Sequence, residues 1–461
     1  MLQTRNSVLC MRVKFITFGC KVNQYETQAL VEEFSRHGFV PTLTGDADLY
    51  VINTCSVTAR ADKKAREAVR AIKKENPNAK IAVTGCMAQL NGDKVKKWGV
   101  DWVVGQDKKA DIIKIIFGNG GPQSPLRHFL ARASVAGPRW GQSPVKNIWS
   151  LAISDFFIHR AFVKVQDGCD NRCSFCKIPY IRGASQSRFH KDILDEVRRL
   201  SEKYYEIVLC GVNLGLYGRD LVRFETNGVY RRERDTQRTR NQISLAQLVE
   251  KTLAIKTLGR LRLSSLESIF AGDDLLEFLN HPKFCPHLHI PFQSGDDKVL
   301  KAMNKRETVK GYLEFVEKAR RINPDVAISA DFIVGFPAEG EEEFKNTLEF
   351  LREVKPMRTH LFTFSPREHT PFEGVKIKDK ALIKKRFDLL QETVDQCALD
   401  YARKFIGRKM EIITEERKGD MVYGYTPNYL HVGVNKNLTP GSVVSVVVDS
   451  VKNNIIHTVP A

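Results

Sequence analysis

The sequence alternates short apolar runs with longer helical patterns along most of its length. In residues 11–118 the expected strands are Arg12–Phe18, Leu49–Asn53 and Lys80–Thr84, and each is followed by a helical stretch. This repetition of strand and helix is typical of a parallel sheet with helices on its faces. The pattern predicts an N-terminal α/β domain over residues 11–118.

The alternation of expected strands and helices continues after an interruption at residues 119–157. Residues 119–157 contain a cluster of glycines and prolines, which predicts a linker. In residues 158–396 the expected strands are Ala161–Val165, Glu206–Cys210, Arg260–Ser264, His287–Pro291, Ala327–Val334 and Thr359–Phe364. Six strand–helix units predict a partial (β/α)6 barrel, short of the eight units of a closed one.

Two segments depart from this rhythm. Residues 219–242 are polar and rich in arginine, which predicts a mobile, solvated loop and leaves an RNA contact as the alternative. Residues 397–461 carry short β-type runs separated by Gly, Asn and Pro. They predict a small all-β domain with basic residues at its entrance, namely Arg403, Lys404, Arg408 and Lys409.

Charge and targeting signals narrow the class of protein. There are 72 Lys plus Arg against 54 Asp plus Glu, a formal charge of +18. This excess favours a polyanionic partner such as nucleic acid, although a merely cationic protein is the alternative. The sequence has no run of eighteen apolar residues and no apolar signal-peptide core. We therefore expect no membrane-spanning segment and a cytoplasmic location. Ten cysteines in a reducing location then indicate metal or redox chemistry.

Three cysteines occupy one short loop directly after the Ala161–Val165 strand: Cys169, Cys173 and Cys176. A structural zinc site needs four nitrogen or sulfur ligands, and the sequence offers no fourth one nearby. Three thiolates suit a 4Fe-4S cluster with one iron open to a small molecule. Three buried structural cysteines are the alternative.

Three further cysteines each follow an expected strand: Cys20, Cys55 and Cys86. Because the carboxyl ends of parallel strands share one edge of the sheet, these thiols are expected to converge. Gly19 and Gly85 would let the backbone approach a bulky bound group closely. A second cluster with three protein ligands is predicted; three unrelated buried cysteines are the alternative. The remaining cysteines, Cys10, Cys210, Cys285 and Cys397, are expected to be packing or surface residues.

The Cys169–Cys176 loop, with Phe175 before its last cysteine, resembles the signature of the radical S-adenosylmethionine (SAM) superfamily. The resemblance implies that the open iron binds the amino and carboxylate groups of SAM. It also implies that electron transfer cleaves SAM to methionine and a 5′-deoxyadenosyl radical, with the protein supplying orientation. By this resemblance Phe175 is expected near the adenine. Further SAM contacts are expected at strand ends, at Gly211, Ser264, Gln293 and Asp331, where ordinary strand-end chemistry is the alternative.

The whole chain from residue 11 resembles the radical SAM methylthiotransferases. The matching stretches are Ile178-Pro179 with Arg182-Gly183, His289–Gly295, Met303–Arg306, Phe332–Pro337 and Gly424–Tyr429. The resemblance implies a methylthiotransferase domain, a radical SAM barrel and a C-terminal TRAM RNA-binding domain. It also implies replacement of an unactivated C–H bond by C–S–CH3. An aromatic C–H bond has no acidic proton, which explains why base catalysis would not suffice. One SAM would donate its methyl group to sulfur at the Cys20–Cys55–Cys86 cluster, and another would yield the radical.

Two stretches bear on the substrate: residues 19–26 and residues 211–218 resemble the branch that acts on threonylcarbamoyladenosine. The isopentenyladenosine branch typically has Gln-Met where Lys21-Val22 stands here. The implied product is 2-methylthio-threonylcarbamoyladenosine at position 37, in the tRNA anticodon loop, with a low-potential electron donor and a sulfur donor as partners. Alternatives are methylthiolation of isopentenyladenosine or of a ribosomal-protein aspartate, and a non-catalytic iron–sulfur RNA-binding protein.

Overall fold

The computed structural model describes residues 11–118 except 43, 57 and 58, then 149, 151, 153–156 and 158–460. Within the last range, residues 220, 221, 227, 228, 234–242, 378, 436, 453 and 454 are left out. The chain divides into two compact units. One consists of Met1–Ser154 with Lys177–Ala184, and the other of Asp155–Cys176 with Ser185–Ala461.

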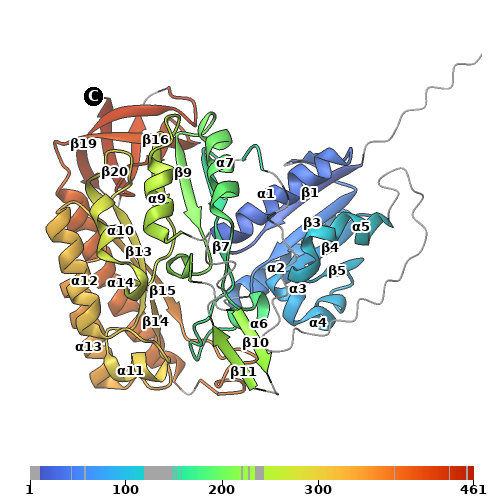
Figure 1. The fold of residues 1–461 in the computed structure, drawn as a ribbon, viewed down its shortest axis with the longest axis horizontal. Helices are drawn as coiled ribbons and strands as arrows, with labels where there is room; N and C mark the ends of the chain where they lie inside the picture. The colour runs from blue at the N-terminus through green and yellow to red at the C-terminus, as the bar shows by residue number, and fades with distance from the viewer. Residues whose placement is uncertain are drawn as a thin grey trace, which may run out of the picture. The chain divides into compact units, whose positions relative to one another are not determined.

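The first unit is built on a five-stranded parallel sheet (Figure 1, blue to cyan). Its strand order is β2 (Val40–Thr42), β1 (Arg12–Thr17), β3 (Leu49–Thr54), β4 (Lys80–Gly85) and β5 (Trp102–Val104). Every residue of β3 is buried, as expected for a central strand covered on both faces. The three predicted strands are confirmed. The edge strands β2 and β5 escaped the sequence pattern because each has only three residues.

The helices of the first unit bury one face against this sheet. In α1 the apolar residues Tyr25, Leu30 and Phe34 are fully buried. The helical segments are α1 (Lys21–Arg36), α2 (Ala59–Glu75), α3 (Cys86–Leu90), α4 (Gly92–Lys96), η1 (Gln106–Asp111), α5 (Ile112–Phe117) and α6 (Ile178–Arg182). Although α6 lies far along the chain, it belongs to this unit.

The second unit contains six parallel strands in the order predicted for a partial barrel (Figure 1). One sheet holds β6 (Arg160–Lys164), β9 (Glu206–Cys210) and β12 (Arg260–Leu263); the other holds β13 (His287–Gln293), β14 (Ala327–Val334) and β15 (Arg358–Thr363). Two parallel bridges, Leu261 to Phe284 and Ser265 to His289, connect the sheets. The partial (β/α)6 barrel is therefore confirmed.

Helices connect these strands, and side-chain caps fix where several of them begin. Ser244 accepts from the backbone N–H of Gln247 in a capping box at α9, and the Thr308 side chain accepts from the backbone N–H of Gly311 at the start of α12. The helical segments are α7 (His190–Ser201), η4 (Leu214–Leu216), α9 (Leu245–Leu253), η5 (Ser268–Phe270), α10 (Asp273–Leu276), η6 (Glu277–Asn280), α11 (Asp297–Ala302), α12 (Val309–Ile322), α13 (Glu341–Val354) and α14 (Lys380–Arg403). A short ladder pairs β7 (Gln166–Asp167) with β8 (Gln186–Ser187).

The predicted all-β domain is a closed five-stranded barrel. Its strands are β16 (Lys409–Lys418), β17 (Met421–Tyr425), β18 (His431–Asn435), β19 (Val443–Lys452) and β20 (Ile455–Pro460). Its apolar core continues through Tyr401 and Phe405 to Met357 and Ala327 of the larger barrel. Helix α14 runs without interruption through residue 397, where the sequence placed a domain boundary, so that boundary stays a prediction.

A turn of the small barrel lies against the amino-terminal ends of the large-barrel strands. Arg262 donates to the carbonyls of Pro427 and Thr426 at 2.9 and 3.1 Å. The ring of Tyr429 stacks on His287, with 4.5 Å between ring centroids. The Arg262 guanidinium carbon lies 4.6 Å from the centroid of the same tyrosine ring. This end of the barrel is therefore lined by a packed, charged layer.

The segment 219–242 differs from its prediction as a mobile loop. It contains an antiparallel hairpin of β10 (Val222–Thr226) and β11 (Val229–Glu233). A polar hairpin lacks the apolar alternation by which strands are recognised in a sequence. The leader Met1–Cys10 and most of the 119–157 linker lie outside the described residues. Among the helices that the structure describes, none has the length and apolar character needed to cross a membrane.

Candidate metal centres

The structure brings Cys20, Cys55 and Cys86 together at the carboxyl edge of the first unit's sheet. Cys20 precedes the first residue of α1, Cys55 directly follows β3, and Cys86 is the first residue of α3. A β-carbon placed on Gly19 would lie 3.0 Å from the Cys55 Sγ atom, so the two turns are in contact. The charge of Cys20 also acts on the Cys86 thiol. The predicted convergence is therefore present, and the role of these thiols as cluster ligands stays a prediction.

The glycines at this edge are required by the close approach of the neighbouring chain. Gly19 and Gly85 have φ angles of +110° and +95°, which residues with a side chain rarely adopt. A β-carbon on Gly85 would lie 2.4 Å from the Thr54 carbonyl oxygen. The sequence assigned these glycines to a bound group, whereas in the structure they let the three strand ends approach one another.

A buried ion network lies behind these thiols. The Glu26 carboxylate is fully buried and accepts from Arg182 at 2.7 and 3.2 Å and from Lys109 at 2.6 Å. Arg182 also donates to the side chain of Asn23, and Lys109 to that of Asn53. Two cations against one carboxylate leave this buried network with a net positive charge.

The thiol of Cys86 responds to both burial and these cations. Burial raises its pKa, while Arg182 and Lys109 act in the opposite direction. Burial also lowers the pKa of Lys109, because a charged ammonium group is costly inside the protein. A four-iron cluster held by three thiolates carries net negative charge, which the buried positive network would offset. The donor set and its surroundings therefore fit such a cluster.

The second cysteine group lies in the second unit, in the loop that follows β7. Burial, and then the charge of Cys176, raise the pKa of Cys169 to about 12. The same two causes raise the pKa of Cys173 well above its ordinary value. The thiols of Cys169 and Cys173 thus resist ionisation unless a cation joins them, and iron would supply that cation. The set of three sulfur donors fits a cluster with one open iron.

The loop that carries these cysteines is held by the end of α11. The Ser174 backbone N–H donates to the Met303 carbonyl at 2.9 Å, and its hydroxyl donates to the Ala302 carbonyl at 2.8 Å. The Asn304 amide donates to the Arg172 carbonyl at 2.7 Å. These contacts fix the loop conformation on both sides of Cys173.

A buried carboxylate organises the other side of this loop. Glu267 accepts from Lys305 at 2.7 Å, from Asn213 at 3.1 Å and from Asn171. The sequence gave Glu267 no role, because nothing in its neighbours indicates a partner in the cysteine loop. Beside this group lies a cavity of about 340 Å³, lined by Asp170, Asn171, Arg172, Cys173, Asn304, Lys305 and Arg306. It offers polar groups next to a predicted cluster ligand.

Three of the predicted SAM contacts lie where the sequence indicated. Gly211 and Ser264 follow neighbouring strands, and the Gly211 N–H donates to the Ser264 hydroxyl at 3.4 Å. Gln293 ends β13 with a φ angle of +70°. A β-carbon on Gly211 would lie 2.9 Å from the Gln166 side-chain oxygen, so the barrel rim is tightly packed there. Contact with SAM stays a prediction for all three.

The other two predicted contacts have partners within the protein. The half-buried ring of Phe175 packs against a cluster containing Val299, Met303 and Phe336. Asp331 lies inside β14 and not at its end, and it accepts hydrogen bonds from two histidines. Contact of Phe175 and Asp331 with SAM stays a prediction.

Comparison with known proteins decides the family. Residues 12–105 match the model of the uncharacterized protein family UPF0004, and residues 163–351 match that of the radical SAM superfamily. The threonylcarbamoyladenosine tRNA methylthiotransferase MtaB of Thermotoga maritima is 35% identical over 410 residues, covering 87% of this chain and 86% of the relative. This chain belongs to the MtaB family.

Other MtaB proteins agree in length as well as in sequence. The MtaB of Bacillus subtilis is 34% identical, with 91% of this chain and 89% of the relative covered. The MtaB of Aquifex aeolicus is 31% identical over 95% of this chain and 100% of its own length. Among solved structures, the cobalamin-dependent SAM radical enzyme OxsB has a TM-score of 0.44 at 11% identity, covering 84% of this chain and 56% of that one.

Membership of the MtaB family and of the radical SAM superfamily settles the class of chemistry. The chain is a radical SAM enzyme, and SAM and 4Fe-4S clusters are its cofactors. Two separate sets of three cysteines are available to hold clusters, one in each compact unit. The predicted family, the radical SAM methylthiotransferases, and the predicted cofactors are thereby confirmed.

Proposed function

We propose that this enzyme converts N6-threonylcarbamoyladenosine at tRNA position 37 to its 2-methylthio derivative. The observation that carries the proposal is the convergence of Cys20, Cys55 and Cys86 in the first unit, in addition to the cysteine loop of the barrel. Radical generation alone needs only the loop. A second set of three thiols supports a reaction that also delivers sulfur.

The chain's own residues would have distinct tasks. When bound, the group at Cys169, Cys173 and Cys176 supplies the electron that cleaves SAM, and the group at the other three cysteines holds the sulfur to be transferred. Glu267 and Lys305 hold the cysteine loop beside the cavity, which supports their role in orienting SAM. Arg182 and Lys109 would offset negative charge at the sulfur-delivering site.

The tRNA substrate is supported by the charge and by the small barrel. Arg403, Lys404, Arg408 and Lys409 are all exposed near the start of the five-stranded barrel. Such residues suit phosphate contacts, while exposed His431 and half-buried Tyr423 form a stacked pair that a base could extend. We therefore assign tRNA binding to this barrel, as a TRAM domain.

The reaction requires two further partners. Reductive cleavage of SAM consumes an electron, so a low-potential electron donor must act on the enzyme. Each product molecule also removes one sulfur atom, so a sulfur donor must replace it. A tRNA substrate and a chain with ten cysteines support a cytoplasmic location for the proposed activity.

The test is turnover by the anaerobically reconstituted enzyme with SAM, a reductant and tRNA carrying threonylcarbamoyladenosine. Mass spectrometry of the digested tRNA should detect the 2-methylthio nucleoside, and 5′-deoxyadenosine should form only when Cys169, Cys173 and Cys176 are present. A matched tRNA carrying isopentenyladenosine should remain unchanged. Methylthiolation of that nucleoside instead would overturn the substrate assignment, and absence of 5′-deoxyadenosine with full cluster content would favour a non-catalytic RNA-binding protein.

A further inference from the structure

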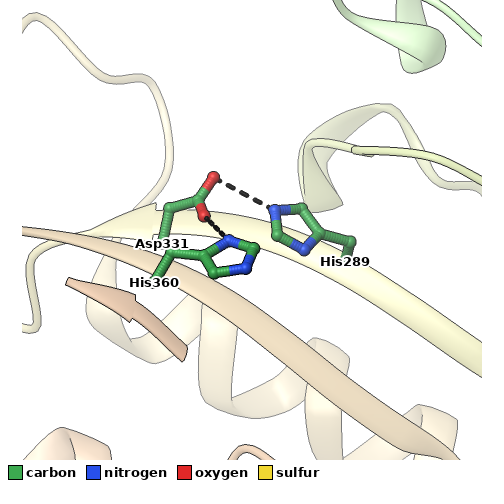
Figure 2. A group of neighbouring side chains, drawn as sticks. All are labelled: His289, Asp331 and His360. Carbon is green, nitrogen blue, oxygen red and sulfur yellow. Dashed lines mark hydrogen bonds and ion pairs between the residues drawn. The ribbon is translucent and has the colours of Figure 1, made fainter. Parts of the chain in front are cut away.

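Three ligand-type side chains meet inside the large barrel, on three neighbouring strands. His289 lies on β13, Asp331 on β14 and His360 on β15, and in Figure 2 dashed lines join the two carboxylate oxygens to one imidazole ring each. One Asp331 oxygen is 3.0 Å from His289 Nε2, and the other is 3.0 Å from His360 Nδ1. Asp331 and His360 are direct partners in the strand register.

These side chains share one face of the sheet. Their neighbours in sequence, such as Ile290, Ala330 and Phe332, are fully buried on the opposite face. The three side chains keep partial access, with 14% of His289, 20% of Asp331 and 46% of His360 exposed. A small ion could therefore reach the group without unfolding of the barrel.

The distances match those between ligands of one metal ion. Bonds of about 2.1 Å place neighbouring ligand atoms about 3.0 Å apart in an octahedral site and about 3.4 Å apart in a tetrahedral one. Both oxygen–nitrogen separations are 3.0 Å, the octahedral value and a few tenths of an ångström below the tetrahedral one. All the ligand atoms of the three residues lie within 4.8 Å of one another, so one ion can contact all of them after small side-chain movements.

A second layer of hydrogen bonds supports the histidine ligand. The Ser329 hydroxyl lies 2.8 Å from His289 Nδ1 and 2.8 Å from His287 Nε2. A hydroxyl can either donate or accept, so Ser329 can accept the Nδ1 proton of His289 when Nε2 binds a metal. Histidine ligands in metal sites are usually oriented in this way through their other ring nitrogen.

The charge of the group also suits a cation. Asp331 supplies the one carboxylate of the group, and each of its two oxygens faces an imidazole nitrogen at 3.0 Å. An anionic oxygen donor between two neutral nitrogen donors is a ligand set that a divalent cation can use. In the part of the chain that the structure describes, this is the one group of three His, Cys, Asp or Glu ligand atoms close enough together to contact a single ion.

We propose that His289, Asp331 and His360 form a third metal site, which binds one divalent first-row ion such as Zn²⁺ or Fe²⁺. Two imidazoles and one carboxylate leave coordination positions open, as in catalytic sites and unlike closed structural ones. An oxygen-bearing ligand such as water or a carboxylate would fill these positions. The site is independent of the cysteine clusters, because it uses only nitrogen and oxygen donors.

The probe is Zn²⁺ added to the holoenzyme after both cysteine sets have been filled by anaerobic reconstitution. After removal of loosely bound metal, about one zinc per chain should remain. X-ray absorption at the zinc edge should show imidazole and oxygen neighbours and no sulfur. Retention of no zinc, or zinc with sulfur neighbours, would overturn the proposal and leave a purely hydrogen-bonded group.

Variants locate the ion. His360→Ala and Asp331→Asn should each weaken zinc binding at least tenfold, while iron and sulfide contents stay at the wild-type level. The control is His37→Ala, which removes an exposed histidine at the end of α1 and should bind zinc normally. Equal zinc retention by all three variants would place the ion elsewhere and contradict the assignment. Unchanged iron and sulfide also separates this result from failure to fold or to assemble clusters.

Discussion

Arg182 and Glu26 are 156 residues apart in the chain and form a buried two-point ion pair at 2.7 and 3.2 Å. Arg182 ends α6, a helix that begins two residues after Cys176 and belongs to the first unit. The pair thus holds α6 within the unit that carries Cys20, Cys55 and Cys86. The same guanidinium group acts on the Cys86 thiol.

Replacing Glu26 should test how much this pair matters for folding. Glu26→Gln leaves Arg182 and Lys109 buried without a countercharge, which costs about 3–5 kcal/mol. Chemical denaturation of the cluster-free protein measures the change. The control is Glu67→Gln, which removes an exposed partner of Lys63 and should cost less than about 1 kcal/mol. Equal effects of the two substitutions would show that the buried network does not stabilise the fold.

Replacing Arg182 should change the potential of the neighbouring cluster. Arg182→Gln removes one buried positive charge, and Glu26 keeps Lys109 as a partner. Less positive surroundings favour the oxidised cluster, so its midpoint potential should fall. The measurement is a redox titration followed by electron paramagnetic resonance in a background lacking Cys169, Cys173 and Cys176. An unchanged or raised potential would separate Arg182 from the electrostatics of this cluster.

Gly85 should tolerate no side chain. Gly85→Ala combines a φ of +95° with a β-carbon 2.4 Å from the Thr54 carbonyl oxygen, so Cys86 must move. Iron content after reconstitution should fall from about eight to about four per chain, because only the first unit's cluster is lost. Gly38→Ala is the control, since Gly38 has a φ of +83° and open space around its Cβ position. Full iron in Gly85→Ala would show that this turn does not position the ligand.

Stability should depend on pH through Glu206, which lies in the layer at the amino-terminal end of the large barrel. Burial opposes its ionisation, but Arg262 and Arg260 hold its pKa well below the ordinary value. A carboxyl whose pKa is lower in the folded state stabilises the protein above its unfolded pKa of about 4.5, and this contribution is lost as pH falls toward the folded value. Wild type should therefore exceed Glu206→Gln in stability at pH 7, and the difference should shrink below pH ~4.5.

The comparison of unfolding free energies at several pH values checks this expectation. Glu206→Gln should cost about 3–5 kcal/mol at neutral pH, because three arginines would lose their buried countercharge. A difference that stays constant down to pH 2 would show that the carboxylate charge is not what stabilises this layer.

The sequence was sufficient where the signal is local. Apolar runs located all six barrel strands, and the regular spacing of Cys20, Cys55 and Cys86 after strands predicted their convergence. The strands β2 and β5 have only three residues each and carry no such pattern, so the sequence did not predict them. The hairpin of β10 and β11 is polar, and its segment was predicted to be a loop.

Long-range pairs could not be read in the same way. Arg182 belongs to a motif that the sequence shows, but its partner Glu26 can be identified only from the fold. The same holds for the contact of Glu267 with Lys305. Asp331 was expected near a strand end as a SAM contact, and no partner for it could be identified because the sequence does not show the strand register. In the structure that register places His360 beside it.

The central claim is that two independent cysteine sets each hold one four-iron cluster. Iron and labile sulfide per chain, measured after anaerobic reconstitution, test it most directly. Wild type should contain about eight irons. Replacing Cys20, Cys55 and Cys86 by Ala, or Cys169, Cys173 and Cys176 by Ala, should leave about four in each case. A fall to zero in either variant, or no change, would contradict two independent sites.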